Sequence, residues 1–154
     1  MGNTPEPFDI LEWHKWKRLL NHVAIVLDDD DELMVYEAYP PTIRRLPYAE
    51  HSQKYLFRTS DRVLYRHPTL TPQQRDAMRS RLVELLGAPY SWLPNIIGAM
   101  AGAWHCLEYV CEAQLTAFGS DLYPRDLSRV GPILWRRTTI NLGWTPTNTT
   151  HKKG

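Results

Sequence analysis

Cys106 is the residue of this sequence whose position best suits nucleophilic chemistry. A thiol reacts as its thiolate, and it needs a nearby imidazole, a positive electrostatic environment and access to a substrate. Cys106 follows a glycine-containing stretch and begins a predicted helix over residues 106–118. The unpaired amide groups and the macrodipole at the start of a helix favour the thiolate over the thiol. The sequence therefore predicts an activated cysteine at a helix N-terminus.

His22 and Glu37 are the predicted partners of this thiol. His22 stands at the start of a predicted strand, and Glu37 lies on the strand that follows it. The imidazole would take the thiol proton, and the carboxylate would accept the second ring proton and orient the ring. Cys106, His22 and Glu37 are the expected catalytic residues, and no cofactor or metal ion is expected beside them. Taken singly, each is more often a structural residue, so the hypothesis depends on their combination.

The other histidines and the second cysteine are given lesser roles. His105 precedes the nucleophile and is predicted to point about a quarter turn away from it. His51 and His67 lie in loop-like surroundings and are predicted to be dispensable. Cys111, on the same helix as Cys106, is predicted to face another direction as a small buried hydrophobe, without a disulfide between the two.

A β-hairpin is predicted to carry His22 and Glu37. An apolar, β-branched run starts at His22, and a second apolar run follows the acidic stretch Asp28–Glu32. Two such runs with a polar break are typical of a hairpin with a solvated turn. Consecutive carboxylates lack the spaced ligands and the glycine of a calcium loop, so the acidic stretch is interpreted as the turn. Two short strands are predicted further on, over residues 54–58 and 62–65.

The clearest helix is predicted to begin after Thr71. The Thr71 hydroxyl, Pro72 at the first helical position and Gln74 three residues after Thr71 make a capping box. Gly87 then permits a left-handed C-terminal cap. The helix of the nucleophile is expected to end at a second glycine, Gly119.

The chain is predicted to form one domain. With 154 residues, of which 43% are hydrophobic and 23% charged, it is long enough for a single core. A turn is predicted around residues 124–128 and a last strand over residues 132–136. The end of the chain is rich in Thr and Lys, so we expect a domain over residues 1–144 and a disordered tail over residues 145–154.

Charge and hydropathy exclude several classes of function. A net charge of +1 gives no overall electrostatic footprint for nucleic acid. The N-terminus has neither the basic start nor the apolar run of a secretory signal. The longest apolar stretch, over residues 93–104, is interrupted by proline, asparagine and glycine and is too short to span a bilayer. We therefore expect no nucleic-acid partner, no membrane span, and a location in the cytoplasm or in a phage particle that delivers the protein.

Six short segments carry a resemblance to one known family that runs from about residue 8 to residue 136. They are Phe8–Leu11, His22–Val26, Val35–Ala38, Leu86–Trp92, Trp104–Val110 and Tyr123–Leu127. Their order, with histidine and glutamate before cysteine, is similar to that of the circularly permuted NlpC-type papain-like cysteine hydrolases, in particular the YiiX-like and YebB-like branch. The resemblance implies an α+β fold in which a small antiparallel sheet or barrel carries His22 and Glu37 and packs against the helix that presents Cys106.

The sequence departs from the family pattern at three positions near these segments. Phe8 stands in place of an opening glycine, His105 in place of an aromatic residue, and Leu107 in place of a serine. Glu108 matches a recurring family position, and the resemblance implies that it anchors the start of the helix. The positions of the three expected catalytic residues are kept.

The resemblance also implies a class of activity. It indicates a cysteine amidase or peptidase that acts through a thioester intermediate, with a peptide or acyl-amide substrate and cell-wall peptidoglycan peptides as the first substrate class. A second interpretation follows relatives that resemble lecithin retinol acyltransferase. In this interpretation the protein is an acyl- or lipid-directed thiol hydrolase or acyltransferase, and the apolar residues 93–104 line a groove for the acyl chain of the substrate. A third is a non-catalytic structural component of a virion. Delivery in a phage particle would bring such an enzyme to the cell wall.

Overall fold

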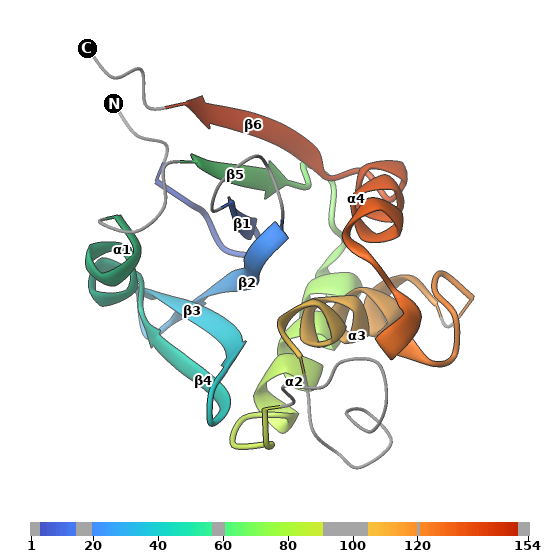
Figure 1. Ribbon diagram of the computed structural model, residues 1–154, viewed down its shortest axis with the longest axis horizontal. Coiled ribbons are helices and arrows are strands. Elements are labelled where there is room, and N and C mark those ends of the chain that lie inside the picture. The colour runs from blue at the N-terminus through green and yellow to red at the C-terminus, as the bar shows by residue number, and fades with distance from the viewer. Residues whose placement is uncertain (1–3, 15–19, 57–60, 91–104, 120, 151–154) are drawn as a thin grey trace.

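The computed structural model describes residues 4–14, 20–56, 61–90, 105–119 and 121–150. They form an α+β structure with a six-stranded antiparallel sheet, in the order β4-β3-β2-β1-β5-β6, and helices on both of its faces (Figure 1). The strands are β1 Ile10–His14, β2 Leu20–Asp29, β3 Glu32–Tyr39, β4 Thr42–Pro47, β5 Asp61–Arg66 and β6 Thr145–Thr150.

The predicted hairpin is confirmed as β2 and β3. Its two strands pair antiparallel from Ile25 opposite Tyr36 to the acidic turn. Asp30 and Asp31 form that turn with φ angles of 49° and 65°, in the left-handed region that aspartate adopts more readily than most residues. Both are exposed, so the predicted solvated turn is confirmed as well.

The sheet divides at the end of the hairpin that lies away from this turn. The described pairing of β2 with β3 ends at Ile25 and Tyr36, whereas β2 goes on pairing with β1, and β3 with β4. His22 and Glu37 lie on the two sides of this division. Because β2 and β3 diverge there, side chains from both strands can meet beside a helix that packs against both.

That helix is α3, Cys106–Phe118, which contacts β2, β3 and helix α2, Pro72–Glu84. The predicted capping box of Thr71 and Gln74 is present at the start of α2. α3 begins at the expected residue and is capped at its end by Gly119, whose φ is 118°. The main core lies between the sheet and these helices, and a smaller apolar cluster lies on the opposite face.

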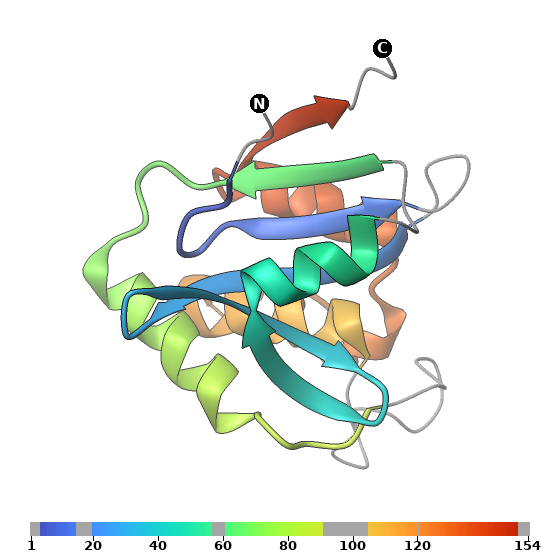
Figure 2. The ribbon, with the colours of Figure 1, turned by 90° about the vertical axis from the view of Figure 1, so that its left-hand side faces the viewer.

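Helix α1, Tyr48–Leu56, covers that opposite face and packs against β3 and β4 (Figure 2). The predicted strand over residues 54–58 is therefore wrong for residues 54–56, while residues 57 and 58 lie outside the described residues. The segment holds no β-branched residue, its first turn is acidic, and most of its residue types favour helix. The strand over residues 62–65 is confirmed as part of β5.

The predicted strand over residues 132–136 is also wrong, because Pro132–Asn141 form helix α4. Proline at the first helical position, after Gly131, is a helix-start signal. Trp135 and Thr139, four residues apart, are the buried side chains of this helix, as expected for one face of a helix rather than a strand. The turn predicted around residues 124–128 is confirmed, and a short 3-10 helix, Leu127–Arg129, ends it.

The disordered tail predicted after Trp144 is wrong over residues 145–150, which form β6 at the edge of the sheet. β6 pairs antiparallel with β5 along all six residues. Trp144 anchors its start, since the indole is 1% exposed and donates a hydrogen bond to the Phe8 carbonyl. Residues 151–154 lie outside the described residues. Within the described parts of the chain, no helix combines the length and the apolar character needed to cross a membrane.

Candidate active site

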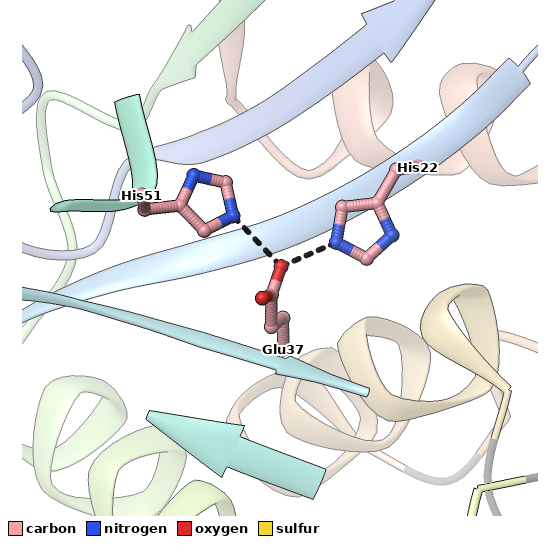
Figure 3. A group of neighbouring side chains, drawn as sticks. All are labelled: His22, Glu37 and His51. Carbon is pink, nitrogen blue, oxygen red and sulfur yellow. Dashed lines mark hydrogen bonds and ion pairs between the residues drawn. The ribbon is translucent and has the colours of Figure 1, made fainter. Parts of the chain in front are cut away.

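His22 and Glu37 meet where β2 and β3 diverge (Figure 3). His22 Nε2 lies 2.5 Å from Glu37 Oε2, and both side chains are buried. An ionised carboxylate only accepts hydrogen bonds, so Nε2 carries a proton and donates it. Nδ1 is then the ring nitrogen that remains for a second partner.

Cys106 is a further partner of the His22 ring. Side-chain hydrogen bonds join its thiol to His22 and to His105, and the residue is 3% exposed. As the first residue of α3, it has a backbone N–H without an intrahelical acceptor, because the helical bonds begin with Tyr109 N–H to the His105 carbonyl. The structure thus brings Glu37, His22 and Cys106, the three expected catalytic residues, together in series.

These contacts set the charges of the site. Burial raises the pKa of Cys106, but hydrogen bonds from His105 and His22 outweigh burial and lower the pKa to about 6. Burial lowers the pKa of His22, but hydrogen bonds to Cys106 and Glu37 outweigh it and raise the pKa to about 10. Burial raises the pKa of Glu37, yet bonds from His22 and His51 hold it well below its ordinary value. At neutral pH the series is therefore carboxylate, imidazolium and thiolate.

Cys111 has the opposite environment on the same helix. It is fully buried in the main core, and this burial raises the pKa of its thiol above the ordinary value. Both cysteines are free, in agreement with the prediction that they form no disulfide. Five residues along one helix therefore separate a thiol whose pKa is lowered from one whose pKa is raised.

His105 lies closer to the thiol than the sequence predicted. Its Nδ1 is 3.8 Å from Cys106 Sγ and accepts a 3.4 Å hydrogen bond from the Leu107 amide. The quarter-turn rule does not apply to it, because His105 is the N-cap residue with an extended backbone and its ring folds over the first turn. His22 differs from His105 in its bond to Glu37, the group that orients the ring.

His51 is a site residue that the sequence analysis missed. It is 0% exposed, and its Nε2 lies 2.8 Å from Glu37 Oε2, the same oxygen that accepts from His22. The prediction of loop-like surroundings is wrong because His51 lies on α1. A signal was available: Pro47 ends a strand, and helix-forming residues with Glu50 in the first turn follow it. Nothing local, however, indicates that the helix docks on β3.

Glu108 lies beside this site, at the third position of α3. It is 2% exposed, and burial raises the pKa of its carboxyl to about 7, while the backbone amide of His105 acts in the opposite direction. A carboxylate at this position can reach back to the amide of the N-cap residue. In the structure, however, both Glu108 carboxylate oxygens are buried without a hydrogen-bond partner, so the implied role of Glu108 at the start of the helix stays a prediction.

Three of these side chains also have the composition of a metal site. One donor atom each from His22, Glu37 and His51 lie within 4.8 Å of one another. Two imidazoles and a carboxylate suit a zinc-type ion, and Arg44 holds the other carboxylate oxygen, as outer partners of metal ligands do. The separations from Glu37 Oε2, 2.5 and 2.8 Å, are those of hydrogen bonds. An ion about 2.0–2.2 Å from every donor atom would need the carboxylate oxygen to draw back.

Comparison with known proteins finds a likeness among solved structures. No protein-family model matches the chain, and no curated protein sequence matches it. Among solved structures, the metalloprotein YiiX of Escherichia coli O157:H7, a DUF1105 protein, is similar with a TM-score of 0.65. The two chains are 14% identical, and the match covers 93% of this chain and 96% of that one. They share a fold. The predicted resemblance to a YiiX-like protein is consistent with this finding.

Proposed function

We propose that this protein is a cysteine hydrolase that cleaves an amide bond through a thioester, on a circularly permuted papain-like fold. The observation that carries the proposal is the series in which Glu37 binds Nε2 of His22 and the Cys106 thiol binds the same ring. A carboxylate, an imidazole and a nucleophile in mutual contact are the groups that acyl transfer requires. The chain order, with the sheet and His22 before the helix of Cys106, supports the permuted form of the fold.

The charges of the three groups define the steps. The Cys106 thiolate attacks the substrate carbonyl carbon and forms a C–S bond, and the amide C–N bond breaks as the imidazolium of His22 gives its proton to the leaving amine. Neutral His22 then takes a proton from water, which attacks the thioester and releases the acid. The thiol leaves as thiolate and His22 is again imidazolium, so the site returns to its starting state.

The oxyanion of each tetrahedral intermediate needs a donor beside the nucleophile. The Cys106 backbone amide is the candidate, because it lies at the positive end of α3 and no helical carbonyl accepts from it. Amides of cell-wall stem peptides are the first substrates to test. Acyl esters, which the same chemistry would cleave, are the second.

The test is hydrolysis of purified muropeptides and, in parallel, of acyl esters. We expect the native protein and Cys106→Ala to differ by at least about 10³-fold in turnover, because the nucleophile is lost. Cys111→Ala, the matched control on the same helix, keeps its activity. Turnover that survives Cys106→Ala would contradict the proposal. The absence of turnover of either substrate class by the native protein would also contradict it and would favour a binding or structural role.

A metal centre is the second candidate, favoured by the cluster of His22, Glu37 and His51. The similar YiiX structure is described as a metalloprotein. A zinc-type ion held there would supply Lewis-acid chemistry and a more acidic bound water. Native mass spectrometry and elemental analysis of the purified protein test this directly. A stoichiometric metal that is lost in His51→Ala and kept in Cys106→Ser would establish the centre, whereas a metal-free protein that turns over substrate in chelator would exclude it.

A further inference from the structure

His51 is joined to the thiol site from the face opposite α3. It is the one fully buried residue among the described side chains of α1, and its Nε2 lies 2.8 Å from Glu37 Oε2. Burying an imidazole has a desolvation cost that only a strong partner offsets. The bond of His51 to a buried carboxylate is such a partner, and it ties α1 to the catalytic side chains.

The Glu37 carboxylate is held at both of its oxygens. Oε2 accepts from His22 at 2.5 Å and from His51 at 2.8 Å. Oε1 accepts a hydrogen bond from Arg44 Nε at 2.9 Å, and Arg44 Nη2 forms an ion pair with the same oxygen at 2.8 Å. Because partners hold both oxygens, any rotation of the carboxylate breaks contacts on both of them. Glu37 can hold only one orientation while all three partners are in place.

Trp13 forms a common wall for the two imidazoles. Its ring stacks on His22 with a centroid separation of 5.5 Å and lies 4.9 Å from the ring of His51. The two histidines therefore meet Glu37 at defined angles as well as at defined distances. A change at His51 reaches His22 through the carboxylate and through this shared wall.

We propose that His51 is a positioning residue: it holds Glu37 from the side opposite His22 and thereby keeps the His22 ring directed at Cys106. This inference rests on the proposed cysteine hydrolase. Without the donor of His51, Oε2 has one fewer bond to hold it, the carboxylate rotates, and His22 spends part of its time away from the thiol. The thiolate then loses its imidazolium partner for that part of the time.

The experiment follows alkylation of Cys106 by iodoacetamide against pH, in protein treated with chelator so that no metal contributes. His51→Leu removes the donor, and His51→Gln places an amide N–H where Nε2 was. We expect His51→Leu to move the acid limb of the profile up by about one pH unit, which makes alkylation below that limb roughly tenfold slower. His51→Gln should restore most of the native profile, because the bond to Glu37 is remade.

His67→Leu is the matched control, because His67 is a partly buried histidine outside the site that donates a hydrogen bond to the backbone carbonyl of Leu142. It should lower the melting temperature and leave the alkylation profile unchanged. If His51→Leu does the same, or if His51→Gln fails to restore the profile, the inference is overturned. If His51→Leu does not fold, His51→Asn, whose shorter amide falls short of Glu37, provides the same comparison. The alkylation experiment uses no substrate, so a negative result for His51 leaves the hydrolase proposal standing. If the protein hydrolyses no tested substrate but the alkylation profile shifts as expected, the inference about His51 still stands.

Discussion

A buried thiol can react at neutral pH only where its charge is compensated, and Cys106 meets that condition through two imidazoles. Burial by itself would keep the proton on sulfur, as it does at Cys111. The difference between the two cysteines therefore comes from their partners rather than from their exposure.

Mild alkylation should separate these two thiols. Iodoacetamide at a pH near 6 is expected to modify Cys106 first, because a pKa of about 6 leaves roughly half of it as thiolate. Peptide mass mapping identifies the modified residue. Replacement of His22 by Ala should slow the reaction, since the thiolate loses its imidazolium. Modification of Cys111 first would show that the nucleophile is wrongly assigned.

The pH dependence of hydrolysis should have two limbs. The rate requires the thiolate, which is present above the Cys106 pKa of about 6, and the imidazolium, which is present below the His22 pKa of about 10. kcat/KM should therefore rise through the first value and fall through the second. Alkylation requires only the thiolate, so its profile should rise through the first value without falling at the second. An alkaline fall in both profiles would argue against His22 as the acid.

At the scale of elements, the chain enters β1 through a strained residue. Phe8 has a φ of 72°, where the resembling family has a glycine, and its ring is 5% exposed. The guanidinium groups of Arg75 and Arg79 lie over that ring at 5.4 and 5.6 Å. Burial of the aromatic ring thus offsets a backbone conformation that costs about 1–2 kcal/mol for a residue with a Cβ.

Because of this strain, replacement of Phe8 by glycine should cost less stability than replacement by alanine, which is the reverse of the usual order. Phe8→Ala should destabilise by about 3–5 kcal/mol, and Phe8→Gly by about 1 kcal/mol less, because glycine adopts positive φ freely. At Met78, buried in the middle of α2, the order should be the ordinary one, with glycine worse than alanine by about 1 kcal/mol. Denaturant unfolding measures all four values. A Phe8→Gly variant less stable than Phe8→Ala would disprove the strain.

At the scale of the whole molecule, the sheet depends on its last strand. β6 covers the edge of β5, far in sequence from the hairpin that carries the site. An uncovered edge exposes backbone groups that can pair with another chain. The C-terminal segment is thus part of the fold and not an appendage.

Truncation tests this role of β6. A chain that stops after Trp144 should lose about 2 kcal/mol of unfolding free energy, because ladder bonds of about 1 kcal/mol each are partly offset by the entropy of ordering the strand. It should also associate on gel filtration. A chain that stops after Thr150 is the control and should behave as the full chain. Equal stability of the two truncated chains would mean that residues 145–150 add nothing to the sheet.

Local signals in the sequence determined the elements that present the three expected site residues. The capping box at Thr71, the glycine after α3 and the polar break in the hairpin each act over a few residues, so they can be recognised without knowledge of the fold. The placing of Cys106 at a helix start, and of His22 and Glu37 on adjacent strands, followed from the same signals and from the family resemblance.

Tertiary structure alone decided the rest. The Thr- and Lys-rich end becomes a strand because β5 offers an unpaired edge, and that edge is formed by residues about 80 positions earlier. α1 is short and polar, and only its docking on β3 and β4 brings His51 to Glu37. His105 turns toward the thiol because it is a helix cap, which helical periodicity does not describe. Contacts between distant segments, rather than local propensity, therefore complete the candidate site.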